Sequence, residues 1–153
     1  MADDGSAQGS TWPLPKFYFS VDIADVGTNL PFQEVTGLDT EAQVIEYRAG
    51  NSKAFSTIKM PGIVKSGNVT LKKGVFVKDN KFWDWYNQRK MNLIKRSAIT
   101  IKLLDQDANP TMTWTLTNAW PTKITSTDLK ADGNEVAVET IEIAHEGVTI
   151  ANK

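Results

Sequence analysis

The sequence contains no cysteine and only one histidine, His145. Without cysteine there can be no disulfide, thiolate metal site or thiol nucleophile. One histidine also rules out metal sites that need several imidazoles. No apolar run approaches the roughly 18–20 residues of a membrane-spanning helix. The chain therefore lacks the usual signals of a disulfide-linked protein, a thiolate or multi-histidine metalloprotein and a helical membrane protein.

Neither sign of charge dominates, since 17 lysines and arginines stand against 18 aspartates and glutamates. A protein that binds nucleic acid through bulk electrostatics normally carries a basic excess, so we expect no direct sequence-specific nucleic-acid binding. The local lysines between Lys65 and Arg96, beside Trp83, are better explained as a solvated or docking face than as a strand-binding platform. The acidic start of the chain is unlike a secretory signal, so we expect synthesis in a cytosol.

Recognisable catalytic motifs are also missing. The neighbours His145 and Glu146 are capable of acid–base chemistry, but no Gly-x-Ser-x-Gly elbow supplies a nucleophile beside them. We therefore interpret His145 as structural and predict that the protein is not an enzyme. Neither a phosphate loop nor a calcium loop has the required spacing, so we expect no cofactor and no metal.

What the chain does contain is β-strand patterning. At 153 residues and 41% hydrophobic content it suits one domain, which we place at residues 11–153 after a flexible segment at residues 1–10. Alternating apolar residues predict a mainly β fold, an antiparallel β-sandwich or barrel of seven or eight strands. The expected strands are residues 17–23, 32–48 with a break at Gly37, 64–76, 99–103 and 112–117.

One segment, Asn80–Lys90, has helical spacing. Its apolar stripe predicts packing against a sheet, with Asp79 or Asn80 as the N-cap. Trp83 lies off that stripe. The stripe consists of Phe82, Trp85, Tyr86 and Arg89.

The remaining segments are read as loops, turns and a last strand. Residues 49–62 are predicted to form a long loop closed by Pro61 and Gly62, and residues 118–124 a bulky turn. Residues 135–146 are predicted to form one long strand with a β-bulge near Glu139 and Thr140, because its apolar residues change phase there. Its acid series has two readings, a solvated strand face or a polar face that lines a channel.

Several motifs, in their order and spacing, resemble the tail-tube family of contractile phage tails and related injection particles. The similarity covers about residues 15–150 and includes tubes of T4-like phages. The motifs are Trp12–Phe19, Tyr47–Asn51, Lys59–Gly62, Val69–Gly74, Ala119–Thr122 and Glu135–Glu142.

The resemblance implies a structural subunit of an inner tube with an Hcp-like fold. Homohexameric rings would stack helically into a hollow tube that sheath contraction drives through a target envelope. The implied partners are other copies of the chain, a sheath protein, baseplate or hub and terminator proteins, and a cargo effector or DNA in the lumen. Assembly is expected in the bacterial cytoplasm, followed by incorporation into a phage tail or an extracellular or anchored particle.

The resemblance also assigns candidate surfaces. The candidates for ring stacking are Trp12, Arg48, Asn51, Lys53, Phe55 and Lys59. The candidates for strands that line the lumen or join subunits are Glu41, Gln43, Glu135, Glu139 and Glu142. The candidates on a helix that faces the sheath are Lys81, Asp84 and Gln88.

Two other functions remain open at this point. One is a secreted, ring-forming Hcp-type component of a type VI secretion system, which shares the implied fold. The other is a sandwich-type carbohydrate or ligand-binding module that uses Trp83 or Trp120, since one fold can host many functions.

Overall fold

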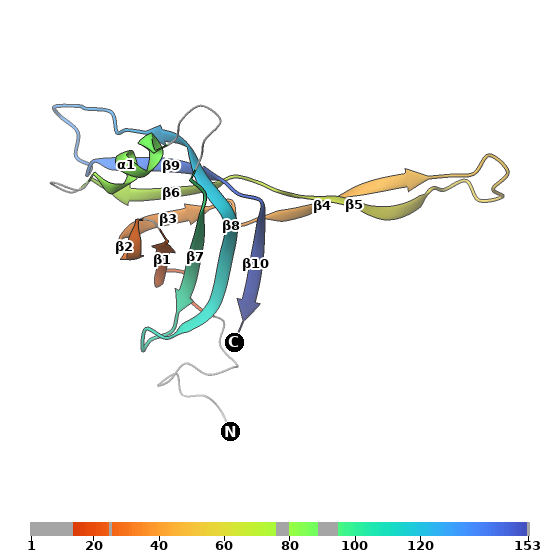
Figure 1. The fold of residues 1–153 in the computed structure, drawn as a ribbon, viewed down its shortest axis with the longest axis horizontal. Coiled ribbons are helices and arrows are strands. Elements are labelled where there is room, and N and C mark those ends of the chain that lie inside the picture. Colours follow the sequence, from red (N-terminus) through yellow and green to blue (C-terminus); the bar gives the residue numbers. More distant parts are fainter. Residues whose placement is uncertain (1–13, 25, 76–79, 89–94, 153) are drawn as a thin grey trace, which may run out of the picture.

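The computed structural model describes residues 14–24, 26–75, 80–88 and 95–152, which form ten strands and one helix (Figure 1). The prediction of a mainly β, antiparallel fold with one helix is confirmed. The elements are β1 (Phe19–Ile23), β2 (Gly27–Leu30), β3 (Phe32–Thr36), β4 (Thr40–Tyr47), β5 (Ile58–Ser66), β6 (Val69–Gly74), α1 (Lys81–Asn87), β7 (Ser97–Leu104), β8 (Pro110–Thr125), β9 (Val138–Ala144) and β10 (Gly147–Asn152). The segment predicted to be flexible, residues 1–10, lies outside the described residues.

The body of the molecule consists of two antiparallel layers that share β8. One layer has the order β2-β1-β7-β8-β10 and the other has the order β8-β9-β6-β3. The core lies between them, because the inward residues of both layers are apolar and buried, as in other sandwiches. The most fully buried of these apolar residues are Val21, Ile23, Val69, Leu71, Ile99, Ile101, Leu116 and Ile143.

Strand β8 has 16 residues and continues through the segment that was expected to turn. The predicted turn at residues 118–124 is therefore wrong. Asn118 has a φ of 50°, and a register shift separates Pro121 from Lys123 in the pairing with β9. These irregularities bend the strand from one layer into the other, which is the usual effect of a bulge. Such a bulge also accommodates a proline, which has no N–H to donate to the ladder.

The last predicted strand is divided differently from the expectation. Of the predicted residues 135–146, only residues 138–144 form a strand, β9. The strand ends before His145 and Glu146, and a further strand, β10, follows the predicted range. The predicted bulge near Glu139 and Thr140 is wrong. The pairing of β9 with β6 runs without interruption from Val138 to Ile143. The apparent change of phase has two sources. Val136, 76% exposed, precedes the strand, and Val138, the first residue of β9, alternates onto the face opposite Ile141 and Ile143.

Helix α1 packs as its apolar stripe predicts, with Phe82 and Trp85 buried. Asn80 occupies the N-cap position, although its side chain makes no capping hydrogen bond to the backbone. Trp83 is half exposed and stacks on Tyr86 at a centroid distance of 5.8 Å. The helix ends at Asn87, and positions 79, 89 and 90 of the prediction lie outside the described residues.

Strands β4 and β5 form a separate two-stranded hairpin that projects away from the body (Figure 1). We call this hairpin, residues 40–66, the arm. The predicted loop over residues 49–62 is wrong, because β5 begins at Ile58 and only residues 48–57 connect the strands. The predicted strand over residues 64–76 is likewise two strands, since β5 ends at Ser66 and β6 begins at Val69.

Candidate assembly interface

The arm carries apolar side chains on both of its faces. Directly opposed residues of two antiparallel strands lie on the same face, and successive residues alternate. The pairs Ile45–Met60 and Tyr47–Ile58 therefore share one face, whereas Ala42–Val64 and Val44–Pro61 share the other. Gln43 lies opposite a bulge in β5, where the register shifts. A ribbon with this pattern has no polar face to turn toward water.

Most of these side chains are exposed in the isolated subunit. All eight residues of β4 are exposed, and Ile63 and Val64 of β5 are 74% and 63% exposed. Contiguous apolar surface of this kind marks interaction sites in soluble proteins. An isolated two-stranded hairpin is also only marginally stable in water. The arm therefore requires a partner surface to cover it.

The tip of the arm, residues 48–57, is held in shape by one guanidinium group. Arg48 donates from Nε to the carbonyl oxygen of Ala54 at 3.1 Å and from Nη2 to that of Ser52 at 3.2 Å. Two bonds from one planar group fix the path of the loop. The loop presents Phe55, which is 99% exposed. An ordered loop that displays a bare aromatic ring has the form of an interface anchor.

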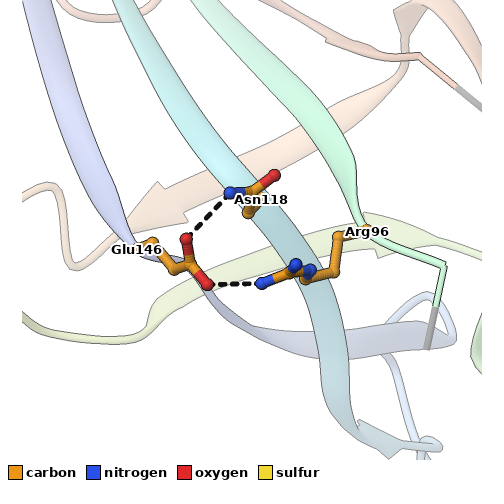
Figure 2. Close-up of polar contacts among 3 residues, drawn as sticks. All are labelled: Arg96, Asn118 and Glu146. Atoms are coloured by element: carbon orange, nitrogen blue, oxygen red, sulfur yellow. Dashed lines mark hydrogen bonds and ion pairs between the residues drawn. The ribbon is translucent and has the colours of Figure 1, made fainter. Parts of the chain in front are cut away.

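A polar cluster fixes the corner at which β8 passes from one layer to the other (Figure 2). The Glu146 carboxylate accepts hydrogen bonds from Arg96 Nη1 and, at 2.8 Å, from Asn118 Nδ2. The neighbouring His145 donates from Nε2 to the carbonyl oxygen of Gly67 at 2.9 Å, where the arm rejoins the body. His145 and Glu146 thus have different hydrogen-bond partners among the described residues.

Three strands of the body have an open edge. Among the described residues, β2 pairs only with β1, β3 only with β6, and β10 only with β8. Unpaired strand edges present free N–H and C=O groups that another chain can use. The described residues contain no cluster of metal-ligating side chains and no helix able to span a membrane. The geometry therefore offers surfaces for association between chains.

The sequence model of one family, described as T4-like virus tail tube protein gp19, matches residues 15–149. The chain belongs to this tail tube family. A chain of the sheath–tube complex of an extracellular contractile injection system, PVC, in its extended state is 35% identical, with 94% of this chain and 95% of that chain covered and a TM-score of 0.86. No curated protein matches the sequence.

Two further solved structures are similar to this chain, one at high and one at low sequence identity. A chain from the tube-terminating cap of the anti-feeding prophage, AFP, is 33% identical over 100% of both chains, with a TM-score of 0.86. Hcp1 from Flavobacterium johnsoniae is 13% identical, covers 90% of this chain and 97% of its own, and has a TM-score of 0.53. That second likeness concerns the fold alone and confirms the expected Hcp-like architecture.

The arm carries predicted residues of two groups, the ring-stacking candidates and the lumen candidates, at different positions along its length. Four ring-stacking candidates lie at the tip, and Lys59 lies in β5 opposite Glu46. The lumen candidates Glu41 and Gln43 lie in β4 near the root of the same arm, with Glu41 opposite Lys65. The tip candidates are Arg48, Asn51, Lys53 and Phe55. The remaining stacking candidate, Trp12, lies outside the described residues.

The three acidic candidates near the C-terminus lie in different environments. Glu135 is exposed in the loop before β9, whereas Glu142 accepts a hydrogen bond from Asn68 Nδ2 at 2.8 Å. Glu139 lies 2.7 Å from the Nζ atom of Lys73, whose side chain is only 1% exposed. The Lys73 ammonium also lies 4.8 Å from the centroid of the Phe82 ring. Glu139, with 26% of its side chain exposed, is thus the ion-pair partner of a buried lysine that contacts α1.

The helix candidates Lys81 and Asp84 lie in α1, Gln88 is its C-cap residue, and all three are exposed. Trp120 is half buried within β8, and Trp83 is half exposed on the helix.

Sequence reasoning missed the apolar residues of the arm as interface residues. These residues are Val44, Ile45, Ile58, Met60, Ile63 and Val64. The sequence signal for these two strands was the run of apolar residues on both sides of the polar tip. Pro61 and Gly62 obscured it, because a proline followed by a glycine is typical of a turn. Proline is tolerated here because β5 is an edge strand with one partner.

The root of the arm depends on one glycine, so Gly37→Ala is expected to destabilise the fold by about 2 kcal/mol. Gly37 has a φ of +87°, and a Cβ atom there would lie 2.2 Å from the carbonyl oxygen of Asn68. Urea denaturation would measure the change. Gly50→Ala is the matched control, because no atom lies within 4 Å of its added Cβ. Equal effects of the two substitutions would contradict the role assigned to Gly37.

Proposed function

We propose that this tail tube protein forms hexameric rings that stack into the hollow inner tube of a contractile injection system or phage tail. The tube conveys cargo and is driven through a target envelope when a surrounding sheath contracts. Residues 11–153 act as a single tail-tube domain without enzymatic activity. The observation that carries the proposal is the arm, which exposes apolar residues on both faces and cannot remain uncovered in water.

The open edges support ring formation. A ring closes the unpaired edges of its subunits against one another, which removes the hazard of uncontrolled edge-to-edge pairing. In the body, the described strands β2, β3 and β10 offer such edges, since each has one partner. The candidates for strands that line the lumen or join subunits remain Glu41 and Gln43 in the arm and Glu135, Glu139 and Glu142 in or before β9.

Partners follow from what the relatives assemble with. The PVC relative comes from a sheath–tube complex, and the AFP relatives come from a tube-terminating cap and a baseplate. We assign this chain a sheath protein, baseplate or hub proteins and a terminator as partners, with an effector or DNA as the lumen cargo. The exposed α1 residues Lys81, Asp84 and Gln88 are candidates for the sheath contact. Assembly takes place in the bacterial cytoplasm, before the particle becomes extracellular or anchored.

A secreted Hcp-type ring is the alternative. The chain is 35% identical to the PVC relative but only 13% identical to Hcp1 from Flavobacterium johnsoniae. The difference favours a tube that polymerises inside a sheath.

Negative-stain electron microscopy of the purified chain is expected to show rings and tubes. Lys53→Glu is expected to block stacking while rings persist, because it reverses the charge at the exposed tip of the arm. Lys130→Glu, in the exposed loop before β9, is the matched control and is expected to leave tubes intact. Monodisperse monomers at high concentration, with and without a sheath protein, would contradict the proposal.

A further inference from the structure

An apolar groove opens between the two layers of the body, at the end of the sandwich next to the root of the arm. Its volume is about 560 Å³. Its apolar walls are Phe17, Phe19, Val35, Leu38, Ile101, Leu103 and Trp114. Four of these residues also pack against the buried core, and Phe17 is 82% exposed. The groove is therefore an uncovered end of the core.

We propose that the tip of the arm from a second copy of this chain occupies the groove, with Phe55 as the inserted anchor. The inference rests on the proposed tube function and specifies which surface receives the arm. An aromatic side chain buries about 150–250 Å² when it enters such a site. Phe55 offers nearly all of its surface, since it is 99% exposed.

The arm cannot fill the groove of its own chain. Residues 33–36 and Leu38 line the groove and lead directly into β4, so the groove lies at the root of the arm. The tip lies at the far end, well away from the body (Figure 1). The eight residues of β4 alone extend about 26 Å. The groove lies at one end of the arm and the Phe55 anchor at the other, so the anchor that fills a groove must come from a different copy of the chain.

This arrangement gives a heterologous contact, in which the tip of one copy meets the root of the next. Heterologous contacts that do not close on themselves produce open-ended assemblies. Each added ring would present a fresh set of tips or a fresh set of grooves. The contact thus fits stacking, which has no natural end, better than ring closure.

Charge supports the same pairing. Lys53 is exposed at the tip, and Asp39, which follows the groove residue Leu38 in sequence, is also exposed. Neither residue has an ion-pair partner among the described residues. The groove lining itself carries one charge of each sign, Lys16 and Glu34. Seating Phe55 in the groove brings Lys53 toward Asp39, the residue after Leu38, which favours the correct register of tip and groove.

Disulfide cross-linking tests the contact cleanly, because the chain has no cysteine of its own. Ser56→Cys at the tip is combined with Gln33→Cys in the groove, and assembled tubes are oxidised. The expected result is a ladder of covalent multimers on a non-reducing gel, since each copy links to two others. The control pair, Ser56→Cys with Asp132→Cys in the loop before β9, is expected to give no ladder.

The outcomes separate the groove from the tube function. Tubes that form without a ladder from the tip–groove pair, or an equal ladder from the control pair, would overturn the groove assignment alone. A parent chain that forms neither rings nor tubes would contradict the proposed function and this inference with it. An internal disulfide between Ser10→Cys and Gln33→Cys, at the expense of the ladder, would assign the groove to the chain's own N-terminal segment and also overturn the inference.

Two further variants test the anchor and the charge pair. Phe55→Ala is expected to raise the critical concentration for tube assembly roughly 30-fold, as for a buried aromatic anchor, whereas Thr57→Ala stays within about twofold. Adding Asp39→Lys to Lys53→Glu is expected to restore stacking, because the swapped charges again attract. An unchanged critical concentration in Phe55→Ala tubes would overturn the anchor, and a failed rescue would overturn the charge pairing.

Discussion

Replacing residues 41–65 with an Asn-Gly turn is expected to abolish tubes and leave the body folded. Thr40 and Ser66 are directly paired across the hairpin, so a two-residue type I′ turn joins them without moving the body. The free energy of unfolding is expected to change by less than about 1 kcal/mol, because no residue of the arm belongs to the buried core. Electron microscopy and urea denaturation of the same preparation would measure both effects.

The size of the assembly effect follows from the exposure of the arm. Its two apolar faces contribute nothing to the stability of the isolated subunit, so their value is realised only against another copy. The unmodified chain at equal concentration is the control. Tubes that persist without the arm would place the stacking surface elsewhere, and a loss of several kcal/mol would make the arm part of the subunit fold.

Glu139→Ala is expected to lower the free energy of unfolding by about 3 kcal/mol, since it removes the carboxylate that faces a buried ammonium group. The Nζ atom of Lys73 lies 2.7 Å from Glu139, and its side chain is 1% exposed. The contact of that ammonium with the Phe82 ring remains in the variant and offsets part of the loss. Urea denaturation monitored by tryptophan fluorescence would follow both the core and α1.

Two companion variants make this result specific. Glu135→Ala removes an acid from the exposed loop before β9 and is expected to change stability by less than about 0.5 kcal/mol. Lys73→Met in the Glu139→Ala background is expected to recover most of the loss, because replacing both charges of a buried pair with apolar groups is often nearly neutral. A loss in Glu139→Ala no larger than in Glu135→Ala would show that the ammonium does not depend on this carboxylate.

Local sequence patterns were sufficient where one face of an element is buried. Alternation predicted β1 and β7, and the stripe of Phe82 and Trp85 predicted the packing of α1, because burial of one face imposes its own period. The resemblance to tail tubes likewise indicated the family from residues scattered along the chain. Glu139 shows the limit of this reasoning. Its sequence neighbours suggest an exposed strand, and only its pairing with β6 places it opposite Lys73.

The sequence by itself determined the antiparallel β class, the single helix and the tail tube family. Tertiary structure alone decided that residues 58–66 return along β4 to form the arm, and that β8 continues through Pro121. The reason is physical. Periodicity records which face of a segment meets the core of its own subunit, and both faces of the arm are exposed there. A strand that is covered by another subunit, and not by its own core, need not show this alternation of apolar and polar residues in its sequence.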